Sequence, residues 1–134
     1  MADETPKGHT NRSTGLQGEA LAADFLEAKG YTILDRNYRF LREEVDLVCF
    51  APWPAGDGGE IVFVEVKARR GTGYGRPEEA VTPAKQKAIM RVAEAYLFER
   101  KLGGAIVRFD VIAILFERGV PTIEHLENAF GYFV

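Results

Sequence analysis

Two strand-like segments joined by a proline- and glycine-rich turn constrain the fold of this chain most strongly. Residues 44–51 (EVDLVCFA) and 60–68 (EIVFVEVKA) are rich in β-branched and aromatic side chains, which favour strands. The residues between them, PWPAGDGG, include two prolines and three glycines and cannot continue a strand. The sequence therefore predicts two strands that pair as an antiparallel hairpin.

The other elements are predicted from their periodicity. Apolar residues at helical spacing indicate a helix over residues 13–29, and a second helix from the N-cap Thr82 to about Leu102. The remaining strands are expected over residues 31–38, 106–116 and 122–126. The order α-β-β-β-α-β-β predicts one α/β domain over residues 13–134, and the polar residues 1–12 are expected to form a flexible arm.

Composition narrows the class of protein. A chain of 134 residues with 46% hydrophobic residues can bury a core without disulfides. Its only cysteine, Cys49, excludes an internal disulfide and a cysteine-based zinc cluster, and fits a reducing cytoplasm and a small core position. No apolar run is long enough to span a membrane. We therefore expect a cytoplasmic protein that does not associate with membranes.

The distribution of charge points to an anionic partner. The net charge is −3, which argues against coating nucleic acid through positive charge alone. Residues 67–91 nevertheless carry seven basic side chains against two acidic ones. This segment either faces an anion or is an ordinary solvated surface.

Charged residues interrupt the two most apolar strands. Asp46 lies in the middle of one predicted strand, and Glu65 and Lys67 lie in the other. A buried carboxylate is costly unless it is paired or binds a metal. Alternation along a strand puts Glu65 with Lys67 on one face, and Glu44 with Asp46 on one face. The two faces together could hold Mg²⁺ or Mn²⁺ for phosphodiester hydrolysis, or could form an ion pair that only neutralises buried charge.

The order of these motifs resembles a known family. Asp46 followed by Glu65-Val66-Lys67 resembles the signature of the PD-(D/E)XK nuclease superfamily, and the wider pattern closely resembles the YraN family of bacterial endonuclease-like proteins. The resemblance runs from residue 13 onward and rests on GLQGEA (15–20), GY (30–31), NYR (37–39), EVDLV (44–48), VFVEVK (62–67), VT (81–82) with Lys85, RFDV (108–111) and NAF (128–130). It implies a restriction-endonuclease-like α-β-β-β-α-β core, with a mixed central sheet flanked by helices, as in Holliday-junction resolvases.

The resemblance also implies roles for single residues. Asp46, Glu65 and the main-chain carbonyl of Val66 would bind the metal, and Lys67 would assist the nucleophile. Glu19 matches an additional ligand on the first helix, although a glutamate on a helix face is usually just solvated. Glu44 either serves as a ligand or lies at the edge of the site. One departure is Glu43, which stands where the family motif usually has glycine and adds negative charge.

Basic and polar residues after the second hairpin strand are candidates for nucleic-acid contacts. Arg69, Arg70 and Arg76 are expected to grip the substrate from a mobile loop. Lys85 and Gln86 open the second helix, whose N-terminus favours phosphate, and a plain solvated face is the alternative.

Three other features are interpreted structurally. Trp53, between two prolines, is expected to cover the edge of the core rather than to stack on a base. Asp110 is expected to pair with Arg108 or a helix end and not to be catalytic. The apolar C-terminal residues 130–134 are expected to dock on the body or on a second subunit of a homodimer.

Three functions remain open at this point. The first is a Mg²⁺- or Mn²⁺-dependent endonuclease of the endodeoxyribonuclease type, acting on structured or branched nucleic acid, with DNA favoured over RNA. The second is a nucleic-acid-binding module of the same fold with weak or no catalysis. The third is an interaction protein whose charged strands form only an ion-pair network.

Overall fold

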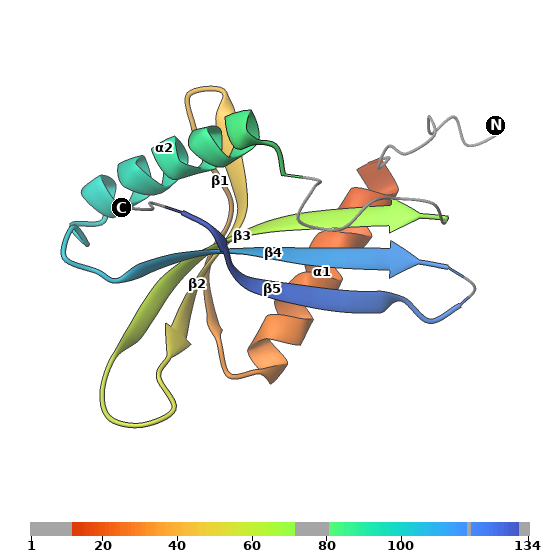
Figure 1. Ribbon diagram of the computed structural model, residues 1–134, viewed down its shortest axis with the longest axis horizontal. Coiled ribbons are helices and arrows are strands. Elements are labelled where there is room, and N and C mark those ends of the chain that lie inside the picture. Colours follow the sequence, from red (N-terminus) through yellow and green to blue (C-terminus); the bar gives the residue numbers. More distant parts are fainter. Residues whose placement is uncertain (1–11, 72–80, 118, 132–134) are drawn as a thin grey trace.

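The fold is described by a computed structural model for residues 12–71, 81–117 and 119–131. Two helices and five strands follow in the predicted order α-β-β-β-α-β-β, which confirms the α/β class (Figure 1). The elements are α1 (Arg12–Ala28), β1 (Thr32–Phe40), β2 (Glu43–Pro52), β3 (Gly59–Arg70), α2 (Pro83–Glu99), β4 (Val107–Phe116) and β5 (Thr122–Phe130). The arm predicted over residues 1–12 lies outside the described residues, apart from Arg12, which already belongs to α1.

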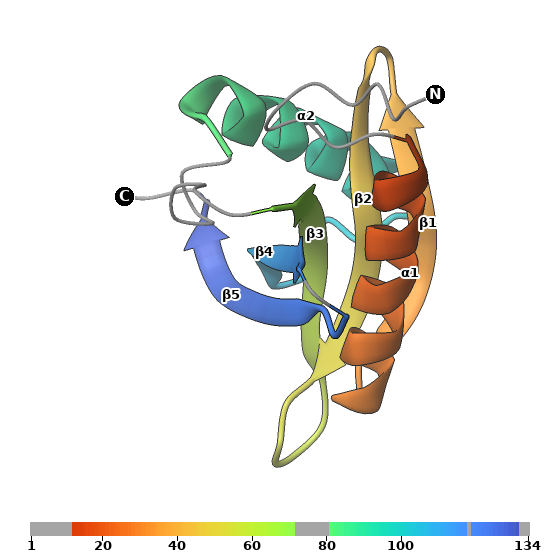
Figure 2. The same ribbon diagram turned by 90° about the vertical axis from the view of Figure 1, so that its right-hand side faces the viewer.

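The five strands form one mixed sheet in the order β1-β2-β3-β4-β5. All neighbouring strands are antiparallel except β3 and β4, which are parallel and joined through α2. The two helices cover opposite faces of the sheet (Figure 2), as the resemblance implied. In the described part of the chain, neither helix has the length and apolar character needed to cross a bilayer.

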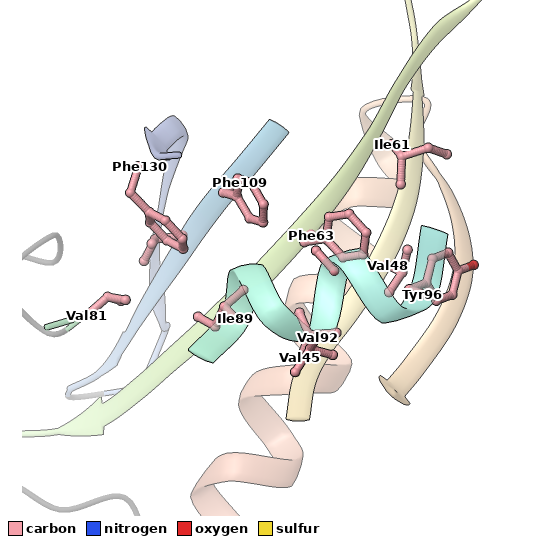
Figure 3. Packing of buried hydrophobic residues seen from close by; sticks show 12 residues of the cluster. Val45, Val48, Ile61, Phe63, Val81, Ile89, Val92, Tyr96, Phe109 and Phe130 are labelled. Carbon is pink, nitrogen blue, oxygen red and sulfur yellow. The ribbon is translucent and has the colours of Figure 1, made fainter. Parts of the chain in front are cut away.

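Each helix covers its own hydrophobic core. On the α2 side, Phe109 stacks between Phe63 and Phe130, with ring centroids 5.7 and 5.3 Å apart (Figure 3). On the α1 side, Leu26 and its neighbours pack against apolar residues of β2, β3 and β4. Cys49 is buried in this second core, as predicted, and burial raises the pKa of its thiol to about 12. Phe130, the first residue of the apolar C-terminal segment, is buried, and residues 132–134 of that segment lie outside the described residues.

The boundaries of three elements differ from the prediction. Helix α2 ends at Glu99 rather than near Leu102, because Lys101 takes a left-handed backbone conformation with φ of 59°. Strand β5 continues to Phe130, since its pairing with β4 extends to Phe109. Strand β3 continues through Arg70, which is paired with Phe116 of β4. The prediction that Arg69 and Arg70 lie in a mobile loop is therefore wrong, because parallel pairing with β4 holds both in the sheet.

A glycine fixes the distance between α1 and the sheet. A Cβ atom added at Gly18 would lie 2.5 Å from the Cβ of Ala68 on β3, closer than side chains approach. We expect Gly18→Ala to lower the free energy of unfolding by about 1–2 kcal/mol, although alanine favours helices more than glycine does. Urea denaturation measures the change. Gly104→Ala, which adds its methyl group to open space, is the control, and equal stability of the two variants would contradict the prediction.

Candidate functional site

The candidate site lies where β2 and β3 diverge beyond Leu47 and Val64. We call this point the fork. The two strands pair as predicted, from Pro52 and Gly59 up to Leu47 and Val64, and then diverge. Beyond this point the side chain of Asp46, instead of the backbone of β2, bonds to β3: its Oδ2 accepts a hydrogen bond of 2.7 Å from the main-chain N–H of Val66. Because this bond replaces the missing strand partner, the fold itself fixes the Asp46 carboxylate in the fork.

Glu65 is the most buried carboxylate at the fork, with only 5% of its surface exposed. Its Oε2 faces two ammonium groups, Lys67 Nζ at 3.4 Å and Lys85 Nζ at 4.0 Å. Its Oε1 is buried and has no hydrogen-bond partner among the residues that the structure describes. The structure thus brings the predicted residues Glu65, Lys67 and Lys85 together, and leaves one carboxylate oxygen available to a ligand.

The field around Asp46 is strongly negative. Burial is the main reason why the pKa of Asp46 lies well above its usual range. The negative charges of Glu65, Glu19 and Glu44 raise this pKa further, and the hydrogen bond from Val66 lowers it. The excess of negative charge favours a bound cation, since a cation stabilises the ionised carboxylates.

Asn37 organises two of these carboxylates, and sequence reasoning did not assign it to the site. Its Nδ2 donates to Glu19 Oε1 at 3.1 Å and to Glu44 Oε2 at 2.8 Å, which links α1, β1 and β2. The backbone of Asn37 is left-handed, with φ of 51°, a conformation that asparagine tolerates better than most residues. An asparagine in the middle of a strand pattern was the only available signal. Arg39 adds a salt bridge of 3.1 Å to Glu44.

The donor set suits a hard cation. Mg²⁺ and Mn²⁺ prefer oxygen ligands and keep several waters, so two carboxylates are a sufficient protein contribution. Asp46 and Glu65 provide them, and the partnerless Oε1 of Glu65 is an unused ligand atom. Over the described ranges, no three side chains of His, Cys, Asp or Glu come close enough to enclose a metal. Asp46 and Glu65 could thus serve as the protein ligands of an open magnesium-type centre, with Glu19 and Glu44 linked nearby by Asn37.

The other predicted contact residues fall into different surroundings. Arg70 donates to Thr14 Oγ1 at 2.8 Å and to Gln17 Oε1 at 3.0 Å, so it joins β3 to α1. Gln86 donates to the main-chain oxygen of Val81 at 3.0 Å. Arg69 lies in β3, and Arg76 falls outside the described residues. Among the members of this group that the structure describes, Lys85 is the residue whose charged atom lies near Glu65.

The structure shows the surroundings of Trp53 and Asp110, two residues that the sequence analysis interpreted as structural. Trp53 closes the turn between β2 and β3: its main-chain N–H donates to Gly58, and its Nε1 donates to Glu60 at 3.1 Å. Asp110 pairs with Arg108, as predicted, at 2.9 Å. It also receives a hydrogen bond of 2.7 Å from His125, which sequence reasoning left without a role. These contacts hold β5 to β4, so the cluster belongs to the framework of the protein.

The fold and the fork define a class: an α/β protein with a carboxylate and lysine cluster at the point where two strands diverge. The chain belongs to the uncharacterised protein family UPF0102, whose model matches residues 18–114, and this confirms the resemblance to the YraN family, which is the same family. A UPF0102 protein of Geobacter sulfurreducens is 48% identical over 123 residues, covering 91% of each chain. One of Chlorobaculum parvum is 46% identical over 128 residues, covering 91% of this chain and 95% of the relative. The matched segment contains the whole fork.

Proposed function

We propose that this protein is a divalent-metal-dependent endonuclease that hydrolyses phosphodiester bonds in structured or branched nucleic acid, with DNA favoured over RNA. The observation that carries the proposal is the arrangement of Glu65. One of its oxygens is buried without a partner, and the other faces Lys67. Asp46 supplies a second, partly buried carboxylate in the same fork. An ion pair that only neutralised charge would leave neither a free oxygen nor a surplus of carboxylates.

Each residue at the fork has a distinct task in this proposal. Asp46 and Glu65 would hold Mg²⁺ or Mn²⁺, with the Val66 carbonyl as a further ligand, and Glu19 as a ligand through water. When bound, the metal polarises a phosphoryl oxygen and lowers the pKa of a water molecule. The Lys67 ammonium orients the attacking water and stabilises charge that develops on the phosphate. Lys85 and the N-terminus of α2, capped by Thr82, hold a neighbouring phosphate.

The overall charge of the protein determines how strongly it would attract an anionic substrate. With a net charge of −3, it depends on the basic segment of residues 67–91 for the approach of an anion. This suits a substrate recognised by shape at one point rather than a duplex that is coated along its length. Cleavage would take place in the cytoplasm, where the Cys49 thiol stays reduced.

A binding module without efficient catalysis is the second candidate. It is favoured by the acidic body, whose net charge of −3 does not by itself attract a polyanion that has to be cleaved. Such a module would keep Lys67, Lys85 and the α2 N-terminus as a phosphate site. Metal-dependent cleavage separates the two candidates.

The test is cleavage of branched, duplex and single-stranded nucleic acids by the purified protein, with Mg²⁺, with Mn²⁺ and with a chelator. We expect cleavage only with metal, and none with Glu65→Gln or Lys67→Met. Lys87→Met removes an exposed lysine from the same helix as Lys85 and is expected to cleave like the wild type. If no substrate is cut while the wild type still binds nucleic acid, the enzyme proposal fails and the binding module is correct.

A further inference from the structure

An open groove with a volume of about 680 Å³ lies between the end of β1 and the exposed side of α2. Figure 1 shows the β1–β2 hairpin next to this helix. The volume is within the range of small-ligand sites. The groove is lined on the hairpin by Tyr38, Arg39, Phe40 and Leu41, and on the helix by Arg91, Glu94, Ala95, Phe98 and Glu99.

Large apolar side chains border the groove and are open to solvent. Leu41 is 83% exposed and Phe98 is 87% exposed, while Phe40 beside them is 39% exposed. Leu41 also has a left-handed backbone, with φ of 57°, in the two-residue turn between β1 and β2. Such a turn favours asparagine or glycine, so neither turn chemistry nor burial explains a leucine here. Its apolar side chain at the tip therefore points to a contact with a ligand.

The groove is connected to the candidate site through two arginines. Arg39 forms a salt bridge of 3.1 Å with Glu44, which Asn37 joins to the carboxylates of the fork. The guanidinium of Arg91 lies 4.0 Å from Glu43, the next residue of the same strand. Lys85 begins the same helix beside Glu65. Arg39 and Arg91 thus connect the groove to Glu44 and Glu43 of β2, next to the fork.

The remaining charges make the groove nearly neutral rather than strongly basic. Glu94 and Glu99 also line it, and Glu99 accepts a hydrogen bond of 2.5 Å from the Tyr38 hydroxyl. Binding there would therefore depend on apolar and aromatic contact more than on charge. Stacking of nucleic-acid bases on aromatic side chains is of this kind and tolerates any base sequence.

We propose that this groove binds an unpaired nucleotide of the nucleic-acid strand whose phosphate lies at the fork. Phe98 and Leu41 contact the faces of the base, and Arg39 and Arg91 contact the adjoining phosphates. The inference rests on the proposed function and names its substrate class: a strand with unpaired bases beside the scissile bond. Bases within a duplex already stack on their neighbours, so only an unpaired base can enter.

The test measures binding in a chelator, so that it does not depend on cleavage. Fluorescence anisotropy would follow a labelled single-stranded oligonucleotide and a blunt duplex of the same sequence. We expect Phe98→Ser to weaken binding of the single strand about tenfold and to leave binding of the duplex unchanged. Leu41→Asn is expected to weaken single-strand binding as well, and it cannot do so by misfolding, because asparagine suits the turn. The control, Val120→Ser, changes an equally exposed apolar residue between β4 and β5.

The outcomes separate this inference from the proposed function. Unchanged single-strand affinity in both groove variants would overturn the inference, even if the protein cleaves with metal. Loss of affinity in both would support it, even if no cleavage is found. The other possible occupant of the groove is a second copy of the chain, and sedimentation of the wild type and the variants tests for it. A wild-type dimer that Phe98→Ser converts to a monomer would show that a second copy covers the groove, and would overturn the inference.

Discussion

Replacing Asp110 with alanine is expected to lower the free energy of unfolding by about 3–5 kcal/mol, because the variant leaves buried charge without a partner. Asp110 has no exposed surface. Its carboxylate accepts hydrogen bonds of 2.9 Å from both Nε and Nη2 of Arg108, one of 2.7 Å from His125 Nε2, and one of 2.9 Å from the main-chain N–H of Asn128. Through these partners, one side chain holds β5 to β4.

The same cluster makes stability sensitive to acid. Burial alone would raise the pKa of Asp110, but the hydrogen bonds from His125, Arg108 and Asn128 outweigh it and hold the pKa below its usual range. A carboxyl whose pKa is lowered by folding stabilises the protein above its unfolded pKa, and this contribution is lost as the pH falls through the folded value. The stability of the wild type should therefore decline at and below about pH 4.

Urea denaturation of the wild type and Asp110→Ala at neutral pH measures the loss of unfolding free energy. A series of wild-type measurements toward pH 3 measures the decline of stability with acid. Asp57→Ala, which removes an exposed aspartate from the turn after β2, controls for the loss of charge. If Asp110→Ala unfolds at the same urea concentration as Asp57→Ala, the cluster does not stabilise the protein as argued.

The central hairpin and the residues at the fork could be predicted because they break a local rule. Strands as apolar as residues 44–51 and 60–68 should not carry Asp46 and Glu65, and their presence indicated a candidate site. Alternation along β3 correctly placed Glu65 and Lys67 together. The helices followed from period and capping, and Thr82 is the N-cap of α2, as predicted.

The parts that could not be predicted depend on contacts between distant segments. Asn37 joins Glu19 and Glu44 only because α1 lies over the β1–β2 hairpin. The extension of β3 to Arg70 depends on parallel pairing with β4, which begins beyond α2. His125 has a role only because β5 places it beside Asp110. No local pattern in the sequence encodes these partners.

We also expect the negative charge of Asp46 at the fork to lower the free energy of unfolding of the metal-free protein. Asp46→Asn keeps an oxygen that accepts the hydrogen bond from Val66, and it removes a charge that burial and three neighbouring carboxylates disfavour. In a chelator, we expect the variant to be more stable than the wild type by on the order of 1 kcal/mol, since sites built for ligands are strained without them.

Divalent metal should reverse this order. A ligand that binds only the folded protein at about 100 times its dissociation constant stabilises it by about 2.7 kcal/mol. We expect Mg²⁺ or Mn²⁺ to raise the melting temperature of the wild type and to leave that of Asp46→Asn nearly unchanged. Asp24→Asn, an exposed aspartate of α1, should respond to metal like the wild type. Equal metal responses of wild type and Asp46→Asn would show that Asp46 binds no metal, whatever the activity of the protein.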